Sequence, residues 1–156
     1  MVIQSLVMPS IALYQPDIAQ NLGTTLRTAA CFGCHTHIIE PCGFPFDDRK
    51  LKRSGMDYID FSTITRHASW QHFVHWLESS QHRLILTTTK TNQAYTHFTF
   101  TDNDIIMAGR ESAGVPDEVH DYCKNRVTIP MQGTSRSMNV AVSTAIILSE
   151  AVRQIR

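Results

Sequence analysis

Three short segments of this 156-residue sequence combine glycine with polar side chains that could hold an anion or a small ligand. The first runs from Asn21 to Arg27, near the start of an expected helix. Free backbone N–H groups at a helix N-terminus favour an anion, and an arginine can donate two hydrogen bonds to a phosphate. An amphipathic helix with a solvated arginine explains the same residues more simply, so this segment alone does not define a site.

The second segment, residues 109–116, reads Gly-Arg-Glu-Ser-Ala-Gly-Val-Pro and follows a short apolar run. Gly109 and Gly114 permit positive φ angles and a close approach of the backbone to a ligand. Arg110 and Glu111 beside them would form a polar pocket floor. An ordinary turn from a strand to a helix has the same composition, so both interpretations stay open.

The third segment, residues 129–139, reads Ile-Pro-Met-Gln-Gly-Thr-Ser-Arg-Ser-Met-Asn and leads into an alanine-rich stretch. A strand end, a polar loop and a helix start in succession suit a small polar ligand. Ser137 can cap the following helix, and capping alone would explain this serine.

These segments need a scaffold that brings them together. Short β-type runs alternate with helical periodicity, which predicts one α/β domain over residues 1–156 with a mainly parallel sheet flanked by helices. The expected strands are 5–14, 36–40, 58–65, 83–89, 104–108 and 126–130, and the expected helices are 19–32, 70–79, 116–123 and 137–155, with a short polar helix or loop at 47–54. Gly33 and Ser69 are expected to cap the first two helices. Because ligands bind at the carboxyl ends of strands in open α/β sheets, the loops after the strands are the places for a site.

Composition excludes several classes of protein. Hydrophobic residues make up 42% and charged residues 18%, which is typical of a globular chain rather than a disordered one. Lys plus Arg and Asp plus Glu number 14 each, which excludes a whole-surface polycation but permits a local basic patch. We find no run near the ~18 apolar residues of a membrane span and no signal-peptide pattern. We therefore expect a cytoplasmic protein with reduced cysteines.

The cysteines offer a competing interpretation. Cys31 and Cys34 form a Cys-x-x-Cys pair, with His35, His37 and Cys42 nearby, and this spacing permits zinc. No second such pair exists, so we expect no metal. A redox role for the pair is weaker still, since no tryptophan or proline frames it.

Taken together and in this order, the three segments resemble the motifs of the SPOUT-class (α/β-knot) RNA methyltransferases, in the branch that methylates ribose 2′-hydroxyls. The resemblance covers about residues 12–154, nearly the whole chain. Residues 37–41 (His-Ile-Ile-Glu-Pro) and 47–58 are similar to a subgroup of small single-domain enzymes. Those enzymes modify the wobble pyrimidine, cytidine or uridine, of certain leucine tRNAs.

The resemblance implies a C-terminal trefoil knot, a homodimer and S-adenosylmethionine (SAM) bound in the knot, with S-adenosylhomocysteine as the product. It implies tRNA as the substrate, without metal or membrane. The residues implied to bind the cofactor are Thr87, Gly109, Ile129, Met131, Ser137 and Met138. Those implied to serve catalysis are Asn21, Arg27, Glu111 and Asn139, with Arg27 of one subunit approaching the pocket of the other.

Methyl transfer to a ribose needs the 2′-oxygen in line with the methyl group and needs the hydroxyl proton removed. In related enzymes the first-motif arginine, here Arg27, is proposed as the base. Guanidinium groups normally stay protonated, so the alternative is that Arg27 anchors the adjacent phosphate and stabilises the developing alkoxide. Glu111 would offset the sulfonium charge or orient the ribose, and Asn21 and Asn139 would hold loops or substrate hydroxyls.

A neutral chain that binds tRNA must concentrate its cations. The residues expected to contact RNA are Arg49, Lys50, Lys52, Arg53 and Arg136. Four phosphate contacts would already make binding strongly salt-dependent. A solvated basic helix face balanced by Asp47 and Asp48 is the alternative.

Two positions depart from the family pattern. Thr24 stands where many relatives have a second asparagine, and Ser149 stands where many have a tyrosine. The second change puts in doubt an aromatic contact across the dimer. Two other functions fit the same resemblance: ribose methylation at another tRNA position or on ribosomal RNA, and RNA binding without catalysis. The intact Arg27 and Glu111 argue against a protein that only binds.

Overall fold

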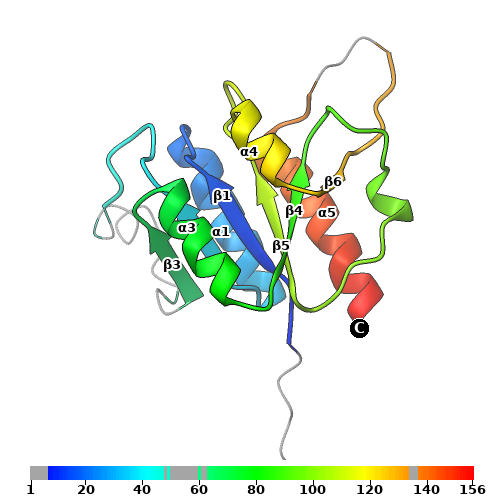
Figure 1. Cartoon of the computed structure of the whole chain (residues 1–156), viewed down its shortest axis with the longest axis horizontal. Helices are drawn as coiled ribbons and strands as arrows, with labels where there is room; N and C mark the ends of the chain where they lie inside the picture. Colours follow the sequence, from blue (N-terminus) through cyan, green and yellow to red (C-terminus); the bar gives the residue numbers. More distant parts are fainter. Residues whose placement is uncertain (1–6, 48, 50–59, 61–62, 134–136) are drawn as a thin grey trace, which may run out of the picture.

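The computed structural model describes residues 7–47, 49, 60, 63–133 and 137–156. Within these residues a sheet of parallel strands runs in the order β3-β2-β1-β5-β4-β6 (Figure 1). The strands are β1 Ser10–Tyr14, β2 Thr36–Ile39, β3 Ile64–His67, β4 Arg83–Thr87, β5 Asp104–Ala108 and β6 Asn125–Val127. The helices are α1 Ala19–Phe32, α3 Trp70–Ser79, the short 3-10 helix η2 Tyr95–His97, α4 Asp117–Tyr122 and α5 Val140–Ile155. The predicted parallel α/β architecture is therefore confirmed.

Helices cover both faces of this sheet. Helices α1 and α5 lie on one face, and α3 and α4 lie on the other (Figure 1). The apolar side chains of each pair belong to a separate core cluster. Neighbouring residues of one strand therefore enter different cores, as Ile105 and Ile106 of β5 do, both with no exposed surface. Burial on both faces explains why the central strands read as continuous apolar runs rather than alternating ones.

Two of the expected helix caps are confirmed. Gly33 ends α1 in the left-handed region, with φ of 71°, and its N–H donates to the carbonyls of Ala29 and Ala30. The side chain of Ser69 accepts a hydrogen bond from the backbone N–H of His72 at 3.1 Å and so starts α3.

The expected start of the last helix is wrong. Helix α5 begins at Val140 rather than at Ser137, and the Asn139 side chain caps it by accepting from the Val142 N–H at 3.1 Å. Asparagine caps a helix as well as serine does, and here the later residue takes the position. Ser137 and Met138 therefore remain outside the helix.

Several strand boundaries also differ from the prediction. Strand β3 runs over 64–67 rather than 58–65, and residues 58–59 and 61–62 of the expected range lie outside the described residues. Strands β4 and β6 end at Thr87 and Val127, earlier than expected. Strand β1 begins at Ser10, and most of the expected segment 47–54 is not described.

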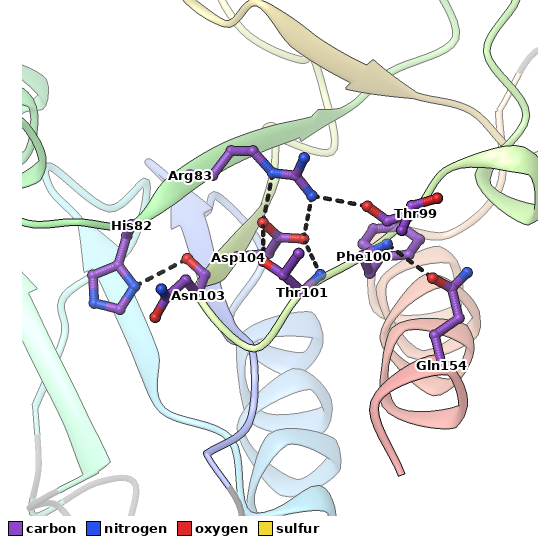
Figure 2. A network of polar contacts seen from close by, with 8 residues as sticks. All are labelled: His82, Arg83, Thr99, Phe100, Thr101, Asn103, Asp104 and Gln154. Atoms are coloured by element: carbon purple, nitrogen blue, oxygen red, sulfur yellow. Dashed lines mark hydrogen bonds and ion pairs between the residues drawn. The ribbon is translucent and has the colours of Figure 1, made fainter.

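A network of polar contacts fixes the starts of β4 and β5, at the end of the sheet opposite the loops expected to hold the site (Figure 2). The carboxylate of Asp104, which has no exposed surface, accepts two hydrogen bonds from Arg83 at 2.7 and 2.8 Å. It also accepts from the backbone N–H of Thr101 at 2.7 Å. Gln154 of α5 accepts from the Phe100 N–H at 2.8 Å, which ties the same turn to the last helix. The two strands are thus fixed relative to one another and to α5.

A cluster of histidines packs beneath α3. His37 of β2 is 3% exposed, and its Nδ1 lies 3.0 Å from Nε2 of His67. The His37 ring also lies 4.6 Å from the Trp76 ring and 4.9 Å from the His35 ring, measured between centroids. Burial first, and then the neighbouring histidines, lower the pKa of His37 from 6.5 to about 3. His37 is therefore held neutral in the folded protein.

This histidine predicts a loss of stability in mild acid. The unfolded chain takes up a proton at His37 near pH 6.5, whereas the folded chain does so only near pH 3. Stability is therefore complete above about pH 6.5 and falls as the pH drops toward 3. At pH 5 this one group lowers the free energy of unfolding by roughly 2 kcal/mol. Urea unfolding at pH 8 and at pH 5 measures this difference in the free energy of unfolding.

The variant His37→Gln should lose stability at pH 8 but show a smaller drop between pH 8 and pH 5. His75→Gln, at an exposed position on α3, is the matched control and should keep the full drop. An equal pH dependence in His37→Gln and the wild type would contradict the role given to this cluster.

Candidate functional site

A cavity of about 330 Å³ opens at the carboxyl ends of β4, β5 and β6. Its lining comes from the ends of these strands, the loops that follow them, the segment before α5 and the first turns of α5 itself. This is the place where an open parallel sheet holds a ligand, and its volume lies in the range of small-molecule pockets.

The structure brings together around this cavity all the residues expected to bind the cofactor. These are Thr87, Gly109, Ile129, Met131, Ser137 and Met138, and Glu111 from the expected catalytic group joins them. Ser137 can reach the cavity because Asn139, rather than Ser137, caps α5. Ile129 reaches it because β6 ends at Val127.

The loop after β5 is closed on itself by its glycines. Arg110 and Gly114 exchange two backbone hydrogen bonds, each of 2.9 Å, and Gly114 has a φ of +60°. A Cβ atom at Gly109 would lie 2.8 Å from the carbonyl carbon of Gly114. The close approach predicted for Gly109 is therefore made to the backbone of its own loop, and it gives that loop its shape.

The loop after β4 contributes more residues than Thr87, which is its one member in the expected cofactor group. Thr88, Thr89 and Lys90 line the cavity beside Thr87, as do Val115 and His120 from the other side. Thr87 donates its hydroxyl proton to the Met107 carbonyl at 3.2 Å and is thereby fixed to β5. The position of 88–90 after a buried strand was a usable signal. We see no signal in the sequence for His120, whose Nε2 is buried and has no hydrogen-bond partner among the described residues.

The remaining three residues of the expected catalytic group do not line this cavity. Asn139 donates from Nδ2 to Oδ1 of Asn21 at 3.1 Å, so the two asparagines join the N-terminal ends of α1 and α5. Arg27 is exposed on α1, away from the cavity of its own chain.

An acidic pair lies at the edge of the site, and the sequence analysis did not predict it. The backbone N–H of Glu111 donates to Asp17 at 3.2 Å, and the backbone N–H of Asp17 donates back to Glu111 at 3.3 Å. Contact with Glu111 holds the pKa of Asp17 well below its usual range. Burial first, and then Asp17, raise the pKa of Glu111.

The residues expected to contact RNA are only partly described. Arg49 is exposed, and its backbone N–H donates to the Asp47 side chain at 2.8 Å. Lys50, Lys52, Arg53 and Arg136 lie outside the described residues.

Within the described part of the chain, no three His, Cys, Asp or Glu side chains form a group that could hold a metal ion. Cys34 is buried, and burial raises the pKa of its thiol to about 11, whereas Cys31 is exposed. The zinc alternative therefore gains no support from these residues. No helix among the described residues is long and apolar enough to cross a membrane.

The model of the SpoU rRNA methylase family matches residues 8–149 of this sequence. The chain belongs to this family. Curated SpoU relatives named tRNA (cytidine(34)-2'-O)-methyltransferase are similar over almost their whole length. The relative from Beijerinckia indica is 52% identical over 145 residues, covering 93% of this chain and 91% of the relative. The relative from Escherichia coli K12 is 39% identical over 150 residues, covering 95% and 94%.

Solved structures of SpoU-type enzymes share the fold. One, described as "Structural insights into the 2-OH methylation of C/U34 on tRNA", superimposes with a TM-score of 0.87 at 35% identity, covering 96% of this chain and 97% of that one. Another, an AdoMet-bound rRNA methyltransferase from Sinorhizobium meliloti, has a TM-score of 0.84 at 26% identity and covers 97% and 58%. The predicted class of RNA methyltransferases is thus confirmed.

Proposed function

We propose that this SpoU-family protein transfers a methyl group from SAM to the ribose 2′-oxygen of the wobble pyrimidine, nucleotide 34, of tRNA, with leucine tRNAs as the expected substrates. The observation that carries the proposal is the convergence of three separate chain segments on one cavity, in a chain up to 52% identical to relatives named for this reaction.

The lining of the cavity fits SAM. Ile129, Met131 and Met138 offer apolar surface for a planar purine, and the hydroxyls of Thr87 and Ser137 offer polar contacts at its rim. Bound there, SAM supplies an electrophilic methyl group on a positively charged sulfur. Glu111 is the carboxyl group among the lining residues and can offset that charge or orient the ribose.

The protein has two remaining tasks, which are to align the 2′-hydroxyl and to assist loss of its proton. Asn21 and Asn139, joined by their hydrogen bond, hold the starts of α1 and α5 together beside the Glu111 loop. Arg27 provides the cation that anchors the neighbouring phosphate and stabilises the developing alkoxide. A phosphate oxygen or water then accepts the proton.

A second copy of the chain completes the site in this proposal. Ile18 and Val142 are 45% and 49% exposed, and they lie at the starts of two helices that pack together. Ile18 and Val142 lie near the joined Asn21 and Asn139, and α1 also carries Arg27. An interface here would bury both apolar residues and bring Arg27 toward a partner's cavity.

The same family placement supports a trefoil knot formed by the C-terminal part of the chain. Edge strand β6 pairs with β4, and the chain then returns so that α5 packs against α1 (Figure 1). We take residues 1–156 as one methyltransferase domain. Its site of action would be the cytoplasm, where tRNA is modified and used.

The basic residues around position 50 predict a salt-sensitive tRNA contact. The double variant Lys52→Ala/Arg53→Ala should weaken tRNA binding about equally for all sequences, because phosphate contacts carry no sequence information. Each lost contact should lower the slope of log K against log salt by roughly one. Filter binding at several salt concentrations measures the tRNA affinity and this slope. SAM affinity should stay unchanged, and an unaltered salt slope would remove these residues from the RNA contact.

The direct test of the proposed reaction uses purified protein, labelled SAM and bulk tRNA from cells that lack the enzyme, followed by digestion to nucleosides. The expected product is 2′-O-methylcytidine or a 2′-O-methyluridine. A base-methylated nucleoside would overturn the proposed chemistry. Incorporation into ribosomal RNA but not tRNA would keep the chemistry and overturn the substrate.

A further inference from the structure

Asp17 lies in the connection between β1 and α1 and clamps the loop that carries Glu111. Its carboxylate accepts the backbone N–H of Glu111 at 3.2 Å and also the hydroxyl proton of Ser112. In return, its own backbone N–H donates to Oε2 of Glu111 at 3.3 Å. Two segments more than ninety residues apart in the sequence are joined by this reciprocal set of contacts.

Asp17 is also held from the opposite side. A Cβ atom at Gly43 would lie 2.7 Å from the Cβ of Asp17, so residue 43 packs directly against it. The Gly43 N–H donates to the Pro16 carbonyl at 2.9 Å, and Gln15 has a positive φ of 43°. These features fix the direction of Asp17 toward the Glu111 loop.

The two carboxyl groups have different places in the site. Glu111 lines the cavity, whereas Asp17 does not. Burial and a side-chain hydrogen bond with Asp17 raise the pKa of Glu111, whereas a side-chain hydrogen bond with Asn21 favours its ionised form. Two other charged groups nearby interact with Tyr14. The guanidinium of Arg110 lies over the Tyr14 ring, 5.6 Å from its centroid, and the charge of Glu118 raises the pKa of Tyr14. His120 lines the cavity. Among these groups, Asp17 is the titratable side chain that acts on Glu111.

We propose that Asp17 is a positioning residue of the methyl-transfer site, which clamps the Glu111 loop and, through its fixed negative charge, sets the acid limit below which Glu111 is protonated and activity is lost. The inference rests on the proposed function. Glu111 lines the cavity, where its ionised form would stabilise a bound cationic cofactor and its protonated form would not. Asp17 acts through Glu111 and need not touch cofactor or substrate.

The variant Asp17→Asn separates the charge from the shape. Its amide oxygen can still accept the Glu111 N–H, but the negative charge beside Glu111 is gone, so Glu111 should ionise at lower pH. The acid limb of kcat/KM should move down by about one pH unit. The value of kcat at pH 8 should fall roughly ten-fold because the loop is held less firmly, with KM for tRNA nearly unchanged. Asp102→Asn, at an exposed acid just before β5 and at the end of the sheet opposite the cavity, is the matched control and should change neither quantity.

A second readout does not depend on activity. Carboxyl ¹³C NMR of the protein without cofactor should show Glu111 titrating above the ordinary glutamate range in the wild type and at lower pH in Asp17→Asn. A wild-type Glu111 that titrates in the ordinary range would overturn the proposal even if the variant failed to fold. An unchanged acid limb in a folded variant would overturn it as well. A wild-type protein that methylates no tRNA would refute the proposed function instead, while the titration would still decide the role of Asp17.

Discussion

Replacing Arg27 with alanine is expected to lower kcat for tRNA methylation by at least about a hundred-fold while SAM still binds. Loss of a group that stabilises developing negative charge or takes part in proton transfer typically costs this much. SAM affinity should be unchanged because Arg27 does not line the cavity of its own chain. Single-turnover methylation measures the rate, and calorimetry with SAM measures binding. Weakened SAM binding of the same size as the rate loss would contradict this assignment.

The variant Arg27→Lys tells a base from an electrostatic anchor. Lysine keeps the positive charge but cannot form the bidentate hydrogen bonds of arginine. An anchoring role therefore predicts partial activity with an unchanged pH profile. A general base would instead move the pH profile, because lysine deprotonates at lower pH than arginine. We expect the anchoring result.

The second large effect is expected at Gly109, where alanine should weaken SAM binding about ten- to hundred-fold. The new Cβ would meet backbone atoms of Gly114 at 2.8 and 2.9 Å, and backbone cannot move aside as a flexible side chain can. Overpacking of this kind costs about 1–3 kcal/mol, here as displacement of the loop that lines the cavity. Calorimetric titration with SAM measures the change.

Gly33→Ala is the control for Gly109→Ala. Gly33 also resists substitution, because its φ is +71°, but a Cβ there meets nothing within 4 Å and the residue lies at the far end of α1. It should lower stability by about 1 kcal/mol and leave SAM affinity unchanged. Equal SAM affinity in Gly109→Ala and the wild type would show that the loop does not shape the cofactor pocket.

Mixing Arg27→Ala and Gly109→Ala subunits tests whether Arg27 of one subunit serves the cavity of its partner. If Arg27 acts on the partner's cavity, mixing Arg27→Ala and Gly109→Ala subunits gives mixed dimers with one intact site each. Random exchange should restore roughly a quarter of wild-type activity. If Arg27 acts within its own subunit, no mixed dimer contains a complete site and activity stays lost.

The bounds of several elements, such as α1 and β5, could be predicted from the sequence, whereas those of edge strand β3 and the start of α5 could not. Helix α1 and strand β5 have the predicted bounds, because periodicity and a clear stop mark both ends of each. Strand β3 is misplaced because it lies at the edge of the sheet and its burial is uneven. Helix α5 starts late because two good capping residues stand two positions apart and only packing decides between them. A knot cannot be inferred from local patterns at all.

The residues of the candidate site were also predicted only in part. The six residues expected to bind the cofactor came from motif resemblance, and they line one cavity. The contact between Asp17 and Glu111 was missed because nothing in the sequence near Asp17 indicates a partner near residue 111, and only the tertiary structure brings the two together. His120 was missed because a histidine in a short helix has many simpler explanations.

The proposed reaction depends on a single oxygen atom of the tRNA, the ribose 2′-oxygen of nucleotide 34. Two leucine tRNAs are prepared, one with 2′-deoxyribose at nucleotide 34 and one with 2′-deoxyribose at nucleotide 32, and each is incubated with the protein and labelled SAM. Removing the single acceptor oxygen should abolish methylation of the first tRNA, while the second should be methylated like the unmodified tRNA. Methylation of the tRNA that lacks the 2′-oxygen at nucleotide 34 would contradict the account.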